Sequence, residues 1–315
     1  MDYIFSARRI RGNAFSSEPG ATRFLRVPAN SDLVTPDHKI RKTDWVREVR
    51  DMSRHGPQDG GEAGDILVYI HGYNTRQKTM LERHRRIRSG LEGLGFEGAV
   101  ISFDWPSQDS ALNYLEDRTD AKQTAIRLVD EGISSFAALQ RPDCQINMHV
   151  FAHSTGAYVV REAFDDADDR PAVAARSWSV SQIMLASGDI SAGSMQSHNA
   201  KSSSLYRHCV RLTNYFNPLD DVLSLSNVKR IGVSPRVGRV GLPDDVPVKS
   251  VNVNCGNYYK AHQNDFDDLP NAAHTWYFFD KKFLKDVLMT LQGKIDRNEI
   301  PTRGHGSGGN LVLIP

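Results

Sequence analysis

One serine stands in a setting that suits nucleophilic catalysis. It is Ser154, in the segment AHSTG, between a predicted strand at residues 146–151 and a predicted helix at residues 156–166. A serine on a sharp turn from strand to helix holds its hydroxyl above the edge of a sheet, where it can attack a carbonyl carbon. Such a turn needs small neighbours; Gly156 is one, and Ala152 stands where this motif usually has glycine. A chance match of five residues is the alternative, and the flanking strand and helix argue against it.

Two backbone amides are expected to face the oxyanion that would form at this serine. The N–H of Thr155 lies at a helix N-terminus, where negative charge is favoured. The second donor is expected in the segment HGYN, which directly follows an apolar run at residues 66–70. Tyr73 is the preferred donor there, with Asn74 as the second choice. His71 is expected to orient this turn rather than to transfer protons.

The elements that would position these groups alternate along the chain. Short runs rich in β-branched residues are typical of buried strands, and apolar residues at three- and four-residue spacing are typical of helices. Strands are predicted at residues 66–70, 98–105, 146–151, 179–187, 209–216 and 248–254. Helices are predicted at residues 43–53, 77–93, 117–140, 156–166 and 283–293. This alternation predicts a three-layer α/β sandwich, with a mostly parallel central sheet covered by helices on both faces.

Three segments are distinguished by composition. Residues 1–60 are expected to form an N-terminal extension, which either supplies the first strands of the sheet or contacts a partner, and residues 56–65 look like a loop. Residues 61–295 are expected to form the α/β domain. Residues 296–315 are polar and rich in glycine, which predicts a mobile C-terminal tail.

A series of motifs resembles the α/β-hydrolase superfamily, and within it a bacterial subgroup of uncharacterised lipase- or esterase-like hydrolases. The motifs occur in the order HGYN, WPS, a tyrosine and an aspartate (Tyr114 and Asp117), HSTG, D-x-x-L-x-x-S, and a histidine followed by aromatic residues. The resemblance covers about residues 64–293. It implies the α/β-hydrolase fold and a catalytic triad of serine, acid and histidine in that chain order.

The resemblance points to Asp220 as the acid of this triad. Leu223 and Ser226 stand three and six residues after it, as the motif D-x-x-L-x-x-S requires, whereas Asp221 does not fit this spacing. Asp189 is a third candidate, because some hydrolases of this fold carry the acid one strand earlier. Each of these aspartates could instead cap a turn, which is the commoner use of aspartate after a strand.

The resemblance likewise points to His274, in the segment AHTWYFF, as the general base. His262 is the nearest rival. His153 adjoins Ser154 and cannot fold back onto its neighbour's hydroxyl, and His149 is expected to point into the sheet. The implied triad is therefore Ser154, His274 and Asp220.

Charge and motif content exclude several other classes of function. Lys plus Arg is 39 and Asp plus Glu is 38, giving a net charge of +1, so no overall field attracts nucleic acid. The basic run at residues 83–88 is interpreted as the solvated face of a helix. There is no HExxH, paired-cysteine, P-loop or GxGxxG motif, and residues 265–270 lack the spacing of a calcium loop. No metal and no organic cofactor are expected.

Hydropathy and cysteine usage indicate a cytoplasmic protein. The longest apolar runs span about five residues, whereas a transmembrane helix needs about 20. The first residues lack the apolar stretch of a secretory signal. Three widely spaced cysteines do not form a disulfide framework.

The sequence therefore predicts a serine hydrolase that cleaves a carboxylic ester of a small molecule or a lipid through a covalent acyl-enzyme. Two alternatives remain open at this point. The fold could be catalytically silent and serve as a binding module, or the same triad could transfer the acyl group to an alcohol or amine. The sequence predicts neither the acyl chain nor the oligomeric state.

Overall fold

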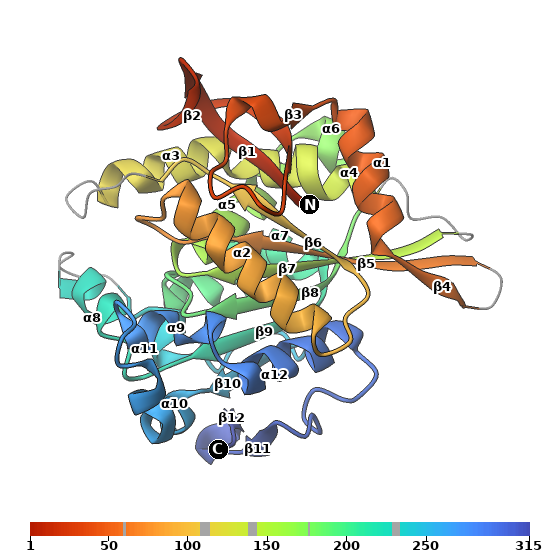
Figure 1. The fold of residues 1–315 in the computed structure, drawn as a ribbon. Coiled ribbons are helices and arrows are strands. Elements are labelled where there is room, and N and C mark those ends of the chain that lie inside the picture. Colours follow the sequence, from red (N-terminus) through yellow and green to blue (C-terminus); the bar gives the residue numbers. More distant parts are fainter. Residues whose placement is uncertain (59–60, 108–113, 138–143, 176, 229–233) are drawn as a thin grey trace.

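One continuous sheet organises the fold (Figure 1). The computed structural model describes residues 1–58, 61–107, 114–137, 144–175, 177–228 and 234–315. Within these ranges twelve strands follow the order β11-β12-β10-β9-β8-β7-β5-β6-β1-β2-β3, and β4 pairs with β5. The strands are β1 (Asp2–Arg11), β2 (Ala14–Val27), β3 (Lys39–Ile40), β4 (Arg54–Gln58), β5 (Gly61–Ile70), β6 (Ala99–Asp104), β7 (Cys144–His153), β8 (Val180–Ala186), β9 (Cys209–Phe216), β10 (Ser250–Asn254), β11 (Arg303–His305) and β12 (Leu311–Leu313).

The sheet is mostly parallel, as expected. Neighbouring strands run parallel from β1 through β6, β5, β7, β8, β9 and β10 to β12. The pairs β1–β2, β2–β3, β4–β5 and β11–β12 are antiparallel. Parallel strands bring their carboxyl ends to one edge of the sheet, and in open α/β sheets ligands bind outside that edge.

Helices cover both faces of the sheet (Figure 1). Residues of α1, α3, α5 and α7 pack in the core of one face, and residues of α2, α10 and α12 pack in the core of the other. The predicted three-layer sandwich is thus confirmed. The helices are α1 (Lys42–Ser53), α2 (Gln77–Glu92), α3 (Tyr114–Arg127), α4 (Ser134–Ala137), α5 (Thr155–Asp168), α6 (Pro171–Ala174), α7 (Ala200–Arg207), α8 (Asp221–Val228), α9 (Val237–Val240), α10 (Gly256–His262), α11 (Ala272–Thr275) and α12 (Lys281–Gln292).

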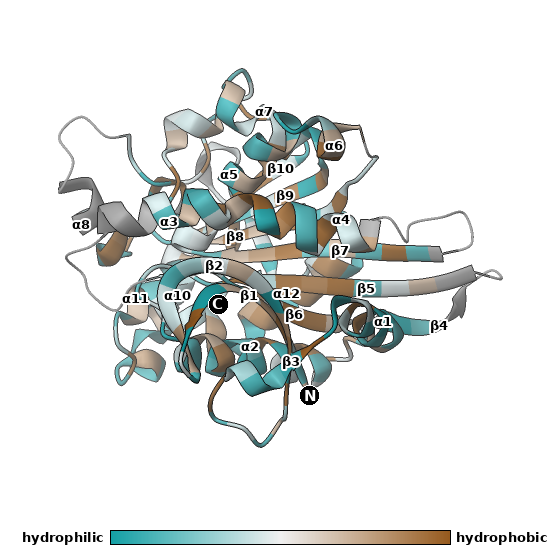
Figure 2. Ribbon diagram, turned by 90° about the horizontal axis from the view of Figure 1, so that it is seen from above, coloured by the Kyte–Doolittle hydropathy of each residue, from teal (hydrophilic) through white to brown (hydrophobic). Residues whose placement is uncertain are grey.

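Strand β5 shows why the central strands are apolar along their whole length. Successive side chains of a strand point to opposite faces. Ile66, Val68 and Ile70 pack in one core, and Leu67 and Tyr69 pack in the other; all are 0% exposed. A strand buried on both faces needs apolar residues at every position, and Figure 2 shows this in the apolar colour of the inner strands.

The N-terminal residues contribute to the same sheet. Strand β1 pairs in parallel with β6, from Tyr3 opposite Ile101 to Ser6 opposite Asp104. Strand β2 covers its outer side as the second arm of an antiparallel hairpin. Residues 1–60 therefore place four strands and helix α1 beside the predicted domain.

The C-terminal residues differ from the expected mobile tail. Residues 303–305 and 311–313 form strands β11 and β12, and β12 extends the parallel sheet beyond β10. Arg303 is buried, and its guanidinium lies 2.6 Å from the carboxylate of Asp286 on α12. A polar and glycine-rich composition predicts a tail, but it does not reveal that one arginine has a buried carboxylate partner.

Two local predictions also need correction. The loop expected at residues 56–65 is instead part of the β4–β5 hairpin, described except for residues 59–60, and β5 pairs with β7 from Glu62 onward. The helix expected at residues 117–140 is divided by a π-helical turn, Leu128–Ile133, between α3 and α4. Glycines favour turns on average, but Gly64 here allows close contact: a Cβ atom would lie 2.7 Å from the Ser53 carbonyl oxygen.

Four segments with candidate functional residues meet at the carboxyl edge of the sheet. Ser154 follows β7, the HGYN turn follows β5, and Asp220 follows β9. His274 lies in α11, within the chain that follows β10. The fold therefore brings His71 and His274, which are 203 positions apart in the sequence, toward one edge of the sheet.

Candidate active site

Ser154 occupies a strained turn between β7 and α5. Its φ and ψ angles are 57° and −127°, in a region that residues with a Cβ atom rarely adopt. Such a conformation costs about 1–3 kcal/mol and persists only when the surroundings enforce it. Here the Ser154 N–H donates to the Ala186 carbonyl, and the Ser154 carbonyl accepts from the N–H groups of Ala157 and Asp189, each at 3.0 Å. The residue is 6% exposed, so it is largely enclosed.

Two glycines allow the chain to come this close. A Cβ atom at Gly156 would lie 2.5 Å from the Ile70 carbonyl oxygen and 2.7 Å from that of His71. A Cβ atom at Gly72 would lie 2.7 Å from the Cβ atom of Ser154. All three distances are shorter than real Cβ contacts. Helix α5 can therefore approach the end of β5, and the HGYN turn can approach the serine, only because these two residues lack side chains.

His274 is hydrogen-bonded to Asp220. Its Nδ1 atom lies 2.7 Å from Asp220 Oδ2, and the carboxylate is fully buried. The other oxygen, Oδ1, accepts the Leu223 N–H at 3.2 Å. The amide of Asn217 also donates to the Ala273 carbonyl at 2.9 Å, so the two loops are joined at a second point. A proton on Nδ1 leaves the Nε2 atom of neutral His274 as the proton acceptor.

His153 fastens the His274 loop to the serine turn. Its Nε2–H donates to the His274 carbonyl at 2.7 Å, and the centroids of the two rings are 4.6 Å apart. Burial, with the nearby His274, holds the pKa of His153 well below its ordinary value, so this ring is neutral. The residue next to Ser154 is therefore in direct contact with His274. This bond could not be predicted from the sequence, because it joins a side chain to a backbone atom 121 positions away.

The other acid candidates are placed differently. Asp189 forms a buried ion pair with Arg236, with 3.0 Å between Oδ1 and Nε, and accepts a hydrogen bond from the Thr155 hydroxyl at 3.4 Å. Asp221 begins α8 and is exposed. Among the three aspartates, the structure thus pairs Asp220 with His274.

The rival histidines have structural partners. His262 Nδ1 donates to the Tyr258 carbonyl at 2.9 Å, and its ring stacks on the ring of Tyr258. His149, on β7, has its Nε2 atom 3.0 Å from Oδ1 of Asp65 on the neighbouring strand β5. Neither of these contacts joins the serine turn.

The HGYN turn is held by its histidine. The buried ring of His71 stacks on Trp105 with 5.4 Å between centroids, and its Nδ1 lies 2.9 Å from the Gly72 carbonyl oxygen. Burial lowers the pKa of His71, which keeps the ring neutral. Asn74 has a φ of 48°, so the backbone reverses sharply just after Tyr73. These contacts agree with an orienting role for His71.

The two amides expected to bind an oxyanion flank this region. Thr155 is the first residue of α5, where N–H groups have no partner inside the helix. The carbonyl of Tyr73 accepts the Thr75 hydroxyl at 3.1 Å, which fixes the peptide that follows it. The side chains of three further motif residues lie outside the described part of the chain: Tyr114, Asp117 and Ser226.

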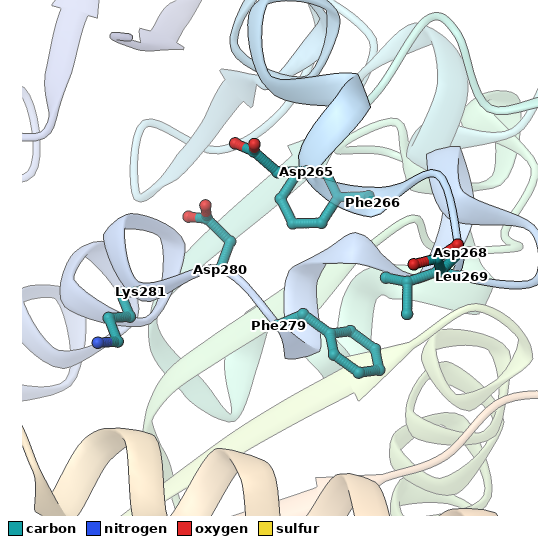
Figure 3. Close-up of a pocket in the computed structure, with 7 residues that line it drawn as sticks. All are labelled: Asp265, Phe266, Asp268, Leu269, Phe279, Asp280 and Lys281. Atoms are coloured by element: carbon teal, nitrogen blue, oxygen red, sulfur yellow. The ribbon is translucent and has the colours of Figure 1, made fainter.

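A pocket of about 510 Å³ lies between residues 265–269, which precede α11, and the start of α12 (Figure 3). It is lined by Asp265, Phe266, Asp268, Leu269, Phe279, Asp280 and Lys281. None of its lining residues belongs to the candidate triad. Two of these residues make structural contacts. Asp280 accepts the N–H of Phe283 at the start of α12, and Phe266 packs against Trp276.

Comparison with known proteins assigns the fold family. Residues 58–271 match the family described as "Alpha/beta hydrolase of unknown function (DUF900)". The chain belongs to this family. The match begins after β1–β3 and ends just before His274, so the N-terminal strands and the candidate base lie outside the matched range.

A curated relative and several solved structures resemble parts of the chain. An uncharacterised protein of Nostoc sp. is 39% identical over 62 residues, which is 20% of this chain and only 15% of the relative's length. A dienelactone hydrolase from Anabaena variabilis is 15% identical, with a TM-score of 0.36, over 72% of this chain and 87% of its own. A cutinase-like protein from Cryptococcus sp. is 13% identical, with a TM-score of 0.34, over 76% of this chain and 94% of its own. Likenesses of this size say nothing of this family member's substrate.

Neither a membrane-spanning helix nor a metal-binding cluster occurs among the described residues. No helix there is long and apolar enough to span a bilayer. No group of three or more His, Cys, Asp or Glu side chains there could hold a metal ion.

Proposed function

We propose that this member of the α/β-hydrolase family cleaves carboxylic esters through a covalent acyl-enzyme. Ser154 is the nucleophile, His274 is the general base, and Asp220 orients the base. One observation carries the proposal: a serine on a strained strand-to-helix turn stands at the same sheet edge as a buried, hydrogen-bonded histidine–aspartate pair. The strained turn destabilises the folded state and presents the serine for attack. The histidine–aspartate pair provides an oriented base for the same reaction.

The first half-reaction forms the acyl-enzyme. His274 Nε2 takes the proton from Ser154 Oγ as that oxygen bonds to the ester carbonyl carbon. The carbonyl oxygen becomes negatively charged and is bound by the N–H groups of Tyr73 and Thr155. When this intermediate collapses, the bond to the alcohol oxygen breaks, and the alcohol leaves with the proton from His274.

The second half-reaction restores the enzyme. His274 takes a proton from water as the water oxygen bonds to the acyl carbon, and the proton then passes to Ser154 Oγ as the carboxylic acid leaves. Asp220 keeps the Nδ1 proton of His274 in place and stabilises the imidazolium that forms in each step. No metal or organic cofactor takes part in this scheme. The two oxyanion donors would each contribute about 3 kcal/mol to stabilising the transition state.

Turnover of p-nitrophenyl esters of increasing acyl length tests the proposal. We expect a burst of p-nitrophenol equal to the enzyme concentration when deacylation is slower than acylation. The matched variants are Ser154→Ala and Ser203→Ala; Ser203 is a partly exposed serine on α7. Activity should be lost in the first variant and kept in the second.

The same assay separates the alternatives. A folded wild-type protein that binds esters without releasing p-nitrophenol would be a silent binding protein, and the proposal would be wrong. Adding an alcohol or an amine reveals acyl transfer: a new ester or amide formed at the expense of free acid would replace hydrolysis by transferase activity. Turnover that survives in Ser154→Ala would refute the nucleophile.

A further inference from the structure

Arg8 on β1 connects three segments at the carboxyl edge of the sheet. Its Nε–H donates to Asp104 Oδ1 at 2.8 Å, its Nη1 to the Ser107 carbonyl at 3.2 Å, and its Nη2 to the Thr75 carbonyl at 3.2 Å. The side chain is buried. Thr75 belongs to the turn that carries Tyr73, so an N-terminal residue outside the family match directly holds the turn expected to bind the oxyanion.

Asp104 is the centre of this network. It also accepts the Ser6 hydroxyl and the Gln77 amide, each at 2.7 Å, and His71 Nε2 lies 3.3 Å away. Burial alone would raise the pKa of Asp104, but the charge of Arg8 and the contacts with His71 hold that pKa well below its ordinary value. The carboxylate is thus ionised and paired. Replacing Arg8 by a neutral residue would leave the buried carboxylate of Asp104 without its cationic partner.

Ser107 adds a second connection to the same turn. Its hydroxyl accepts the Thr75 N–H at 3.3 Å and donates to the Thr75 carbonyl at 3.1 Å. Trp105 donates its indole N–H to the His71 carbonyl at 2.8 Å. The turn contains Gly72 and Asn74, and Asn74 has a positive φ. The contacts from Arg8, Ser107 and Trp105 hold this turn in place from other segments.

We propose that Arg8 is a positioning residue for the oxyanion turn, and that the N-terminal hairpin is therefore a working part of the active site. The inference rests on the proposed function. The planar guanidinium matters because its fork of donors reaches one carboxylate and two carbonyls at once, which a lysine ammonium on a flexible stem does not reproduce. Misplacing a catalytic group by about 1 Å can cost about 100-fold in rate.

Four variants test this role: Arg8→Lys, Arg8→Gln, Ser107→Ala and the control Arg9→Gln. Arg9 is the next residue on β1, is exposed, and its guanidinium pairs with Glu18 at the surface. We expect Arg8→Lys, which keeps the charge beside Asp104, to fold and to lower kcat by about 10- to 100-fold with little change in KM. Ser107→Ala should lower kcat in the same direction by less. Arg9→Gln should match the wild type.

Affinity for a trifluoromethyl ketone provides a readout that a purely structural role would not change. Such a ketone accepts the serine oxygen and forms a tetrahedral oxyanion, so its inhibition constant should rise in parallel with the loss of kcat. Arg8→Lys that folds and keeps wild-type kcat and ketone affinity would overturn the inference. If Arg8→Gln does not fold, Arg8→Lys and Ser107→Ala still decide the matter.

The activity of the wild type separates a failure of the proposed function from a failure of the positioning role of Arg8. If the wild type hydrolyses no ester and binds no ketone, the proposed function fails and the positioning role fails with it. If the wild type is active and Arg8→Lys equals it, only the positioning role fails. Loss of kcat in Arg8→Lys with unchanged ketone affinity would also overturn the role, because it would place the defect outside the oxyanion turn.

Discussion

Two groups of serine, histidine and aspartate side chains in this protein differ in a telling way. One group is the candidate triad at the carboxyl edge of the sheet. The other lies in the core between β6, α2 and the start of β1, where His84 Nδ1 is 2.7 Å from Ser102 Oγ and His84 Nε2 is 3.4 Å from Asp2 Oδ1. By side-chain contacts alone, this second trio also has the composition of a catalytic site.

The backbone separates the two places. Ser102 lies within β6, paired with β1 and β5 on either side, and is completely buried. Asp2 is shared with Arg85 and Arg88, at 2.9 and 3.2 Å, so its charge is used to hold α2 onto the sheet. Ser154 instead ends its strand at a positive φ and opens a helix. The two groups share their side-chain types and differ in backbone position: Ser102 lies inside a strand, whereas Ser154 follows the end of one.

The largest expected effect separates the two serines. Ser154→Ala should lower kcat for an ester by about 10⁵-fold or more, because the nucleophile is lost. Ser102→Ala should leave kcat within a few-fold and lower the free energy of unfolding by about 1–3 kcal/mol, because buried His84 loses its partner. Ester kinetics and urea unfolding of both variants check this. An equal loss of kcat in Ser154→Ala and Ser102→Ala would contradict the assignment of catalysis to Ser154 alone.

The next largest effect concerns the acid. Asp220→Asn should lower kcat by about 10⁴-fold, because an amide at this place favours the wrong tautomer of His274. Asp221→Asn, one residue later on an exposed position, is the matched control and should be neutral. A strong loss in Asp221→Asn together with an active Asp220→Asn would transfer the role to Asp221.

A smaller effect is expected at the close contact between turn and serine. Gly72→Ala would place a Cβ atom 2.7 Å from Ser154 Cβ, so the turn must move, and kcat/KM should fall by about 100-fold. Gly193→Ala is the control, since the nearest atom to its Cβ would be the Ser234 hydroxyl at 3.5 Å, an ordinary contact. Wild-type kcat/KM in Gly72→Ala would show that the turn does not need this position.

The smallest expected effect belongs to the core trio and concerns stability alone. Burial would raise the pKa of Asp2, but His84, Arg85 and Arg88 lower it to about 2. A carboxylate with a lowered pKa stabilises the fold above its unfolded pKa of about 3.9, and that contribution, about 2 kcal/mol, is lost as pH falls toward 2.

Chemical unfolding of Asp2→Asn between pH 2 and pH 7 measures this contribution. The variant should be less stable than the wild type by about 2 kcal/mol at pH 7, and the difference should shrink below pH 4 and vanish near pH 2. Its kcat at pH 7 should be unchanged. A stability difference that stays constant with pH, or a loss of kcat, would contradict a purely structural role for this trio.

The sequence predicted the sheet, most helices and the serine turn because their signals are local. Continuous apolar runs mark strands such as β5, and the pattern around Ser154 needs only ten or so neighbouring residues. The choice of Asp220 and His274 came from motifs of related hydrolases, and the structure joins these two by a hydrogen bond; their catalytic roles stay predictions.

What the sequence could not predict depends on distant partners. Arg8 meets Asp104 across 96 positions, and nothing near Arg8 distinguishes it from Arg9 or Arg11. Arg303 looked like part of a polar tail because its carboxylate partner lies on another element. Composition averages over such residues, so it gives no sign of the buried ion pair of Arg303 or of the pairing of β12 with β10.

The most direct test of Ser154 as the activated nucleophile is to label the folded wild-type protein with a fluorophosphonate. The protein is then digested, and the added mass is located by mass spectrometry. The reagent phosphonylates a serine only where a base activates its oxygen and donors stabilise the charge that forms. We expect the added mass on Ser154 and none on Ser102, with labelling lost in His274→Ala. An unlabelled wild type, or a label on any other serine, would contradict this assignment.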